Sequence, residues 1–239
     1  VDDLPAPRDS RPRKLHGDVG CEHPSPGFPR SIPADYGATM LIHGFVAHSQ
    51  VNGPGVRAVV YCQGCNLGCA SCWNPATHAF TGLSREVEDV ADQIAAAHRT
   101  HEIDGVTFSG GEPMQQASDL LGLIRLLKRA QPELSVGMYS GYTERELDCG
   151  HFWTRHSITE EAKRRIWEDI KQHLDFAVLG RFVAARPSKL PMRASANQAL
   201  LLFSGRYREE HFKPLEFEVH IEAQGFVQIS GFPLAGLPV

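Results

Sequence analysis

Strand-like and helix-like segments alternate along this 239-residue chain from about residue 38 onward. The β-branched stretch RAVVYCQ at 57–63 precedes a helical pattern, SREVEDVADQIAAAHRT at 84–100, for which Ser84 is the predicted N-cap. This alternation repeats and predicts βαβ units, that is, an α/β fold with a mainly parallel sheet. Sites in such sheets lie at the carboxyl ends of the strands, so the segments that directly follow strands are the candidates for function.

The composition divides the chain into three predicted regions. Prolines recur through residues 1–37 and would interrupt any helix there, so we expect a Pro-rich N-terminal arm. Residues 38–205 carry the strand–helix alternation and form the predicted main domain. Residues 206–239 form a predicted extension, in which FEVHIEAQGFVQIS at 217–230 has the pattern of a β-hairpin with its turn near Gln224–Gly225.

Charge and hydropathy argue against two classes of partner. The net charge of −4 favours neither a nucleic acid nor a membrane surface. No apolar run approaches the roughly 20 residues that a membrane-spanning helix needs, and the N-terminus, VDDLPAPRDSRPRKL, lacks the apolar core of a secretory signal. We therefore expect a cytoplasmic protein that binds no nucleic acid and no membrane.

Four of the six cysteines fall in the stretch YCQGCNLGCASCWNP at 61–75. In a reducing compartment such a cluster indicates metal binding rather than disulfides. Three interpretations compete: a structural zinc site with four thiolates, a four-cysteine electron carrier, and a 4Fe-4S cluster held by Cys65, Cys69 and Cys72 with one iron open. Cys62 still belongs to the predicted strand, so we expect it to pack in the fold rather than to bind metal.

The C-x3-C-x2-C spacing in an α/β chain resembles the radical S-adenosylmethionine (SAM) superfamily. The longer stretch NGPGVRAVVYCQGCNLGCASCWNP at 52–75 resembles the signature of glycyl-radical-enzyme activases. Ser71 before the last cysteine, with Trp73 after it, is similar to the branch that activates anaerobic ribonucleotide reductases. SGGEP at 109–113, YSGY at 139–142 and RASANQ at 193–198 extend the resemblance, which covers about residues 38–205. Leu179 and Ala194 depart from the pattern, where an acidic residue and a glycine are common.

The resemblance implies a partial (β/α) barrel and two cofactors, a 4Fe-4S cluster on Cys65, Cys69 and Cys72 and SAM. The residues expected to contact SAM follow strands or belong to the matching motifs: Asn74, Gly110, Gly111, Glu112, Ser140, Gly141, Arg193 and Asn197. The two glycines would let the backbone approach the methionine end of SAM, Glu112 would accept from its ammonium, and Arg193 would bind its carboxylate. On the residues alone, Ser140–Gly141 also fits a plain turn, and Arg193 and Asn197 also fit structural roles.

The implied reaction is reductive cleavage of SAM to a 5′-deoxyadenosyl radical that takes a hydrogen atom from a glycine of a partner protein. A glycyl-radical protein would be the partner, and a flavodoxin- or ferredoxin-type protein the electron donor. One alternative is a stand-alone radical SAM enzyme acting on a small molecule or a peptide, because the arm and the hairpin could close a pocket. Another is a non-catalytic iron–sulfur protein for electron transfer or sensing.

Overall fold

A computed structural model describes residues 39–214, 216–221 and 227–232, so the expected arm at 1–37 lies outside the described residues. The strands are β1 (Thr39–Ser49), β2 (Arg57–Cys62), β3 (Leu83–Glu86), β4 (Gly105–Gly110), β5 (Ser135–Ser140), β6 (Phe176–Leu179), β7 (Ala199–Leu202), β8 (Phe217–Ile221) and β9 (Val227–Gly231). The α-helices are α1 (Val87–His101), α2 (Ala117–Ala130), α3 (Glu144–Asp148) and α4 (Glu160–Lys171). Short 3₁₀ turns occupy Pro75–Thr77, Pro113–Gln116 and Glu209–His211.

A seven-stranded sheet runs through the described residues in the order β3-β1-β2-β4-β5-β6-β7. Its centre, β2-β4-β5-β6, is parallel, whereas β1 and β3 on one side and β7 on the other join antiparallel. The expected α/β fold with a parallel central sheet is thus confirmed, while its assignment to a partial barrel of the radical SAM type stays a prediction. Cys62 pairs with Gly110, and Ser140 with Leu179, so the last residues of these strands meet at one edge.

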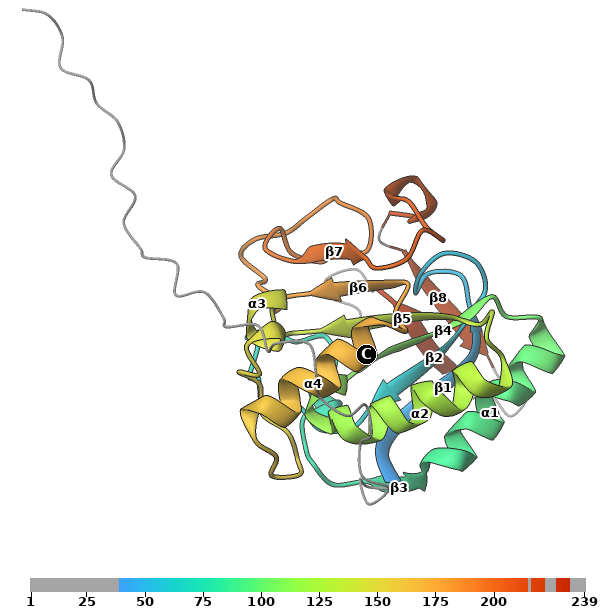
Figure 1. Ribbon diagram of the computed structural model, residues 1–239. Coiled ribbons are helices and arrows are strands. Elements are labelled where there is room, and N and C mark those ends of the chain that lie inside the picture. Colours follow the sequence, from blue (N-terminus) through green and yellow to red (C-terminus); the bar gives the residue numbers. More distant parts are fainter. Residues whose placement is uncertain (1–38, 215, 222–226, 233–239) are drawn as a thin grey trace, which may run out of the picture. The chain divides into compact units, whose positions relative to one another are not determined.

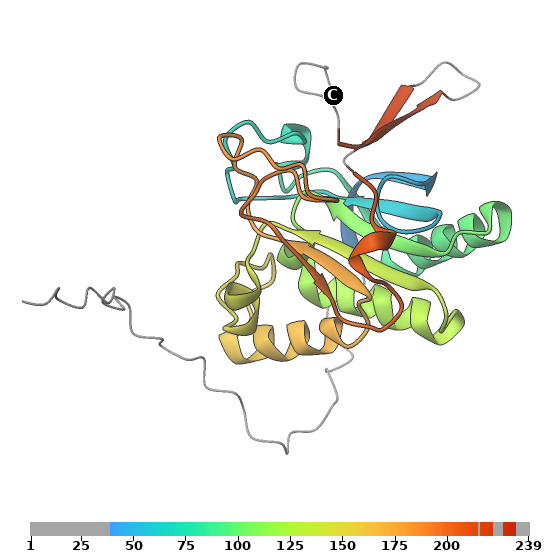
Figure 2. The same ribbon diagram turned by 90° about the horizontal axis from the view of Figure 1, so that it is seen from above.

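Helices α1, α2 and α4 cover one face of the sheet (Figures 1 and 2). Alternate residues of β2, namely Ala58, Val60 and Cys62, face this layer and belong to the main core cluster with the apolar side of α2. Burying a valine or leucine side chain of this cluster stabilises the fold by about 1.5–3 kcal/mol. In the described ranges no helix combines the length and the apolar character needed to cross a bilayer.

Helix α1 begins later than the sequence pattern predicts. Its N-cap is Glu86, not Ser84. The reason is that Leu83–Glu86 pairs with β1 as the edge strand β3, in which Ser84 lies opposite Leu41. Tertiary pairing outweighs the local capping preference here, because it satisfies backbone donors and acceptors along the edge of β1.

The motif Gly53–Gly55–Arg57 lies at the end of the parallel strands opposite to the cysteine loop. Arg57 is fully buried beside Gly105 and Ser135, the first residues of β4 and β5. Its guanidinium donates to the carbonyls of Val106 (2.8 Å) and Ser135 (3.2 Å) and stacks 5.0 Å from the Phe176 ring centre, and burial lowers its pKa. A Cβ at Gly53 would lie 2.6 Å from that ring and 2.8 Å from Arg57. This part of the motif therefore has a structural role, because it packs the end of the sheet opposite to the cysteine loop.

The face of the sheet away from the helices is approached by the hairpin of β8 and β9 (Figure 2). The two strands pair antiparallel from Phe217↔Gly231 to Ile221↔Val227, as the sequence predicts, while the predicted turn at Gln224–Gly225 lies outside the described residues. Ser230 on β9 is 2% exposed and bonds to Tyr61, which projects from this face of β2. The hairpin thus packs on the main sheet through a polar contact.

Candidate functional site

The cysteine loop follows β2 and is closed by its own backbone. Gly64 N–H donates to the carbonyl of Thr77 (2.7 Å), and Cys65 N–H donates to that of His78 (3.0 Å). The Gln63 amide adds a bond to the carbonyl of Ala79 (2.6 Å). These contacts join residues 63–65 at the start of the loop to residues 77–79 at its end. They therefore fix the two ends of the segment that carries the three cysteines.

Burial separates the cysteines into two kinds. Cys62 is fully buried in the core beneath the helices, as its expected packing role requires, whereas Cys65 and Cys72 are partly exposed. Burial raises the pKa of the Cys65 thiol to about 11 and that of Cys72 above its usual range. Thiols with raised pKa values become thiolates when a metal supplies the positive charge.

One pocket gathers most of the predicted site residues. Its lining includes Cys65, Cys69, Cys72, Asn74, Gly110, Gly111, Glu112, Ser140 and Gly141. Among the described residues, no three His, Cys, Asp or Glu side chains are placed to hold one metal ion. A 4Fe-4S cluster makes a different demand, because each cysteine binds a different iron. The donor set, three thiols around an open pocket, fits such a cluster.

The Gly-Gly-Glu segment is docked directly on the cysteine loop. Gly111 N–H donates to the carbonyl of Cys62 (2.8 Å), and Glu112 N–H donates to that of Gly64 (2.9 Å). A Cβ at Gly110 would lie 2.7 Å from the Cys62 nitrogen, and one at Gly111 would lie 2.5 Å from the Gly64 oxygen. The two glycines therefore allow the backbones of the two segments to meet. From the sequence they were expected to make room for SAM, and this contact with the cysteine loop was not predicted.

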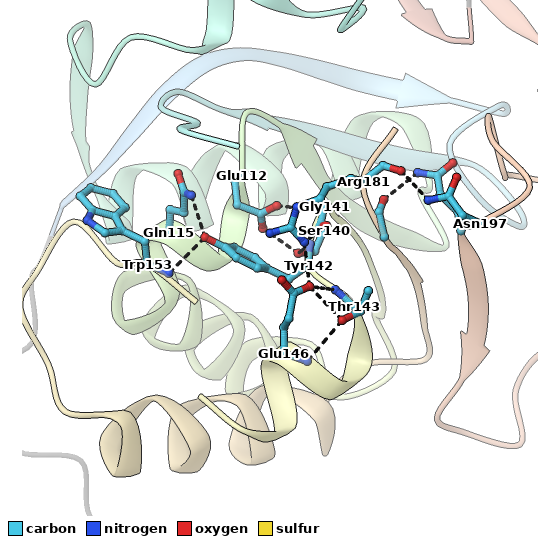
Figure 3. Close-up of polar contacts among 12 residues, drawn as sticks. Glu112, Gln115, Ser140, Gly141, Tyr142, Thr143, Glu146, Trp153, Arg181 and Asn197 are labelled. Atoms are coloured by element: carbon cyan, nitrogen blue, oxygen red, sulfur yellow. Dashed lines mark hydrogen bonds and ion pairs between the residues drawn. The ribbon is translucent and has the colours of Figure 1, made fainter. Parts of the chain in front are cut away.

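Glu112 joins the ends of β4 and β5 (Figure 3). Its carboxylate accepts from Met114 N–H (2.9 Å), the Ser140 hydroxyl (2.8 Å) and Gly141 N–H (2.7 Å). It is 1% exposed, and burial raises its pKa to about 7 despite these bonds. A carboxylate has about four acceptor positions, so Glu112 keeps the capacity to accept one more donor from the pocket.

The buried side-chain amide of Gln115 links three segments near the pocket, and this link was not predicted from the sequence. Gln115 donates to the Asn66 side chain and to the Tyr142 hydroxyl (2.9 Å), and it accepts from Asn66 N–H (3.1 Å). The Tyr142 hydroxyl also accepts from Trp153 N–H (3.1 Å; Figure 3). This network fixes the cysteine loop relative to the loop after β5. Its only sequence signal was the position of Gln115 next to the Gly-Gly-Glu segment.

Arg181 braces the same β5 loop from the other side. It donates to the Gly141 carbonyl (3.0 Å) and to Glu146 (2.7 Å), and its guanidinium lies 5.1 Å from the Tyr142 ring centre. Asn197 in turn donates to the Arg181 carbonyl (2.8 Å; Figure 3). These contacts hold Gly141 in place without themselves reaching the pocket.

Two of the predicted SAM contacts are not part of the pocket lining. Arg193 donates to the Pro191 carbonyl (3.3 Å) and lies 3.9 Å from Glu209. Asn197 supports Arg181, and its side-chain oxygen is buried without a hydrogen-bond partner. Their neighbours Ala194 and Gln198 do line the pocket. A direct contact of Arg193 or Asn197 with SAM stays a prediction.

A family model described as a 4Fe-4S single cluster domain matches residues 51–201. The anaerobic ribonucleoside-triphosphate reductase-activating protein of Vibrio cholerae is 28% identical over 170 residues, which cover 69% of this chain and 99% of that protein. The corresponding protein of phage T4 is 27% identical over 161 residues, covering 63% of this chain and 86% of its own length. The pyruvate formate-lyase-activating enzyme of Listeria monocytogenes is 34% identical over 141 residues, 55% of this chain and 53% of that enzyme, so the match spans about half of the latter.

Proposed function

Since the chain belongs to the family of 4Fe-4S single cluster domains, we propose that it is a radical SAM activating enzyme that generates a glycyl radical in a partner protein. The observation that carries the proposal is the convergence of three cysteines, the Gly-Gly-Glu segment and Ser140–Gly141 on one pocket. An electron carrier or a structural zinc site requires only the cysteines, so neither explains why the Gly-Gly-Glu segment and Ser140–Gly141 line the same pocket.

The proposed cluster ligands are Cys65, Cys69 and Cys72. They line the pocket, while Cys62 lies in the core on the helix side of the sheet and is absent from the lining. Three ligands leave one iron open to a cosubstrate, as the open position of a catalytic metal does. The raised pKa values of the Cys65 and Cys72 thiols predict that cluster binding releases protons, since the ligands bind as thiolates.

The proposed SAM contacts are made by the ends of β4 and β5. Glu112 has an acceptor position to spare for an ammonium group, and Ser140 and Gly141 are held by it at the pocket edge. When bound together, the reduced cluster and SAM would supply the 5′-deoxyadenosyl radical. The residues of the chain orient the reactants and keep water away, and Asn74, Gly110 and Gly111 complete the polar edge of the pocket.

The proposed partner is a glycyl-radical enzyme of the anaerobic ribonucleoside-triphosphate reductase type. The relative from Vibrio cholerae, whose name states this partner, is matched over 99% of its length. The pyruvate formate-lyase-activating enzyme is matched over only 53%. A flavodoxin- or ferredoxin-type protein is the proposed electron donor.

Electron paramagnetic resonance tests this function. The anaerobically reconstituted chain, SAM and a reductant are mixed with the reductase of the same organism, and the glycyl radical is counted. We expect radical formation by the wild-type chain and none with Cys69→Ala. Formation of 5′-deoxyadenosine without any protein radical would refute the proposed partner while leaving the SAM chemistry intact.

A stand-alone enzyme is the second candidate, and one observation favours it. Gly231 and Phe232, which lie outside the family match, line the pocket. Additional chain in the lining helps to enclose the pocket, and enclosure is typical of sites for small molecules. A small-molecule extract that raises 5′-deoxyadenosine formation in the absence of any reductase would support this candidate.

A further inference from the structure

The pocket has an aromatic wall as well as a polar edge. Trp73 follows the last cysteine, and its ring centre lies 5.1 Å from that of Phe182 and 5.7 Å from that of Phe232. Phe232 also lies 5.9 Å from the ring centre of Tyr139 on β5. All four side chains line the pocket. Phe232 is the link in this wall, because it joins the cysteine loop to the central sheet.

The base of the hairpin is built to place Phe232 there. Ser230 is buried, and its hydroxyl lies 2.6 Å from the Asn52 amide nitrogen and 2.9 Å from the Tyr61 hydroxyl. Phe232 N–H donates to the carbonyl of Glu216 (2.8 Å), which closes the end of the hairpin. Two anchors on either side of Gly231 therefore fix the direction in which the chain leaves β9.

Gly231 supplies the turn between these anchors. Its φ of 95° is one that side-chain-bearing residues rarely adopt. A Cβ would also lie 2.5 Å from the Glu216 carbonyl oxygen and 2.6 Å from a methyl of Val51. The backbone conformation that sends Phe232 into the pocket thus depends on glycine at this position.

The hairpin lies outside the part of the chain that matches the family model. The family match ends at residue 201, whereas β8 begins at Phe217. Trp73, Tyr139 and Phe182 lie within the match, so the family part of the chain supplies three of the four rings and the segment after the match supplies the fourth. A residue delivered from outside the common domain is suited to a property that differs between members, such as the choice of substrate.

We propose that Phe232 is a substrate-side wall residue, which holds the segment carrying the target hydrogen and keeps water from the pocket. The inference rests on the proposed function. Other residues of the same lining, Glu112 and Ser140, carry the polar groups that suit SAM. A glycine-bearing segment offers flat amides and C–H groups, which pack on ring faces. Closing the pocket also suppresses side reactions of a reactive intermediate.

The test compares Phe232→Ala and Gly231→Ala with Ile221→Ala in the reconstituted full chain. Ile221 lies on the same hairpin but is 74% exposed, so it is the matched control. For Phe232→Ala and Gly231→Ala we expect SAM affinity to stay within about twofold of the wild type. The 5′-deoxyadenosine made per glycyl radical in the reductase should rise about three- to tenfold in these two variants, as expected for the loss of aromatic contacts, and should not change in Ile221→Ala. Phe232→Tyr keeps an aromatic ring at this position, so it should give the wild-type amount of 5′-deoxyadenosine per glycyl radical. A purely structural role of the hairpin would not require an aromatic ring there.

A second readout needs no turnover. The cluster absorbance of Phe232→Ala should bleach faster in air than that of the wild type or Ile221→Ala, because water and oxygen enter the pocket. A tenfold loss of SAM affinity would overturn the inference, because the wall would then bind the adenosine of SAM. Unchanged coupling with unchanged bleaching would also overturn it. A wild-type chain that makes no 5′-deoxyadenosine refutes the proposed function instead, and the bleaching comparison still decides the role of Phe232.

Discussion

Replacing Gly111 with alanine tests whether the contact between the Gly-Gly-Glu segment and the cysteine loop holds the site together. The added Cβ would lie 2.5 Å from the Gly64 carbonyl oxygen, 3.0 Å from its carbon and 3.1 Å from the Cys62 oxygen. All three are backbone atoms, so no side chain can rotate away. The φ of Gly111 is not in the left-handed region, so the cost is steric alone.

The expected loss of stability follows from the separation of the two backbones that the added Cβ requires. Overpacking at a tight contact costs about 1–3 kcal/mol. Separating the two backbones also weakens the bonds from Gly111 to Cys62 (2.8 Å) and from Glu112 to Gly64 (2.9 Å), each worth about 1 kcal/mol. We therefore expect the free energy of unfolding to fall by about 2–4 kcal/mol and the melting temperature to fall by about 5–15 °C.

The assay is anaerobic thermal unfolding of the reconstituted protein, followed both by circular dichroism and by cluster absorbance. Gly122→Ala is the matched control, because a Cβ at Gly122 in helix α2 meets nothing within 4 Å. That variant should be more stable than the wild type by about 0.5–1 kcal/mol. A Gly111→Ala protein with wild-type stability and a full cluster would refute the packing argument for this site.

Three further predictions concern buried charges. Arg57→Lys should lower the free energy of unfolding by about 2–4 kcal/mol in urea titrations, because lysine cannot replace the forked bonds to the carbonyls of Val106 and Ser135; an unchanged midpoint would contradict this. Burial raises the pKa of Asp119 to about 7, so between pH about 4 and 7 the folded protein holds a proton that the unfolded chain has released. The contribution of Asp119 to stability is therefore greatest below pH about 4 and falls as the pH rises to about 7, and urea titrations across this range should show a smaller loss of stability with rising pH for Asp119→Asn than for the wild type. Glu112→Gln replaces one of the two acceptor oxygens with an NH2 group, so either Gly141 N–H or Met114 N–H loses its acceptor; SAM affinity measured by equilibrium dialysis should fall about tenfold, and an unchanged affinity would remove Glu112 from the proposed contacts.

The ends of the parallel strands were predictable from the sequence. Leucine and isoleucine recur at helical spacing in ASDLLGLIRLLKRA at 117–130, and this pattern coincides with helix α2, Ala117–Ala130. The Cys loop, Gly-Gly-Glu and Ser140–Gly141 each lie at the end of a predicted strand, and parallel strands bring such segments to one edge of the sheet. Local patterns suffice when topology rather than side-chain detail decides where residues meet.

Other parts of the site depend on contacts between distant segments, which local patterns do not specify. The role of Gly111 emerges from its distance to Gly64, and the place of Phe232 from a hairpin that returns to the pocket more than 150 residues after Trp73. Gly53, Gly55 and Arg57 match the same motif as the cysteines, yet they lie at the other end of the strands. Sequence proximity in a motif therefore did not imply a shared place in the site.

Formation of 5′-deoxyadenosine is the most direct test of the central claim. The wild-type chain, reconstituted anaerobically with iron and sulfide, is given SAM and a strong reductant, and the product is measured by mass-resolved chromatography. The account predicts product from the wild type and from Cys62→Ala, and none from Cys65→Ala, Cys69→Ala or Cys72→Ala. A wild-type protein with a full cluster and no product, or a Cys62→Ala variant that loses its iron as completely as the other three, would contradict it.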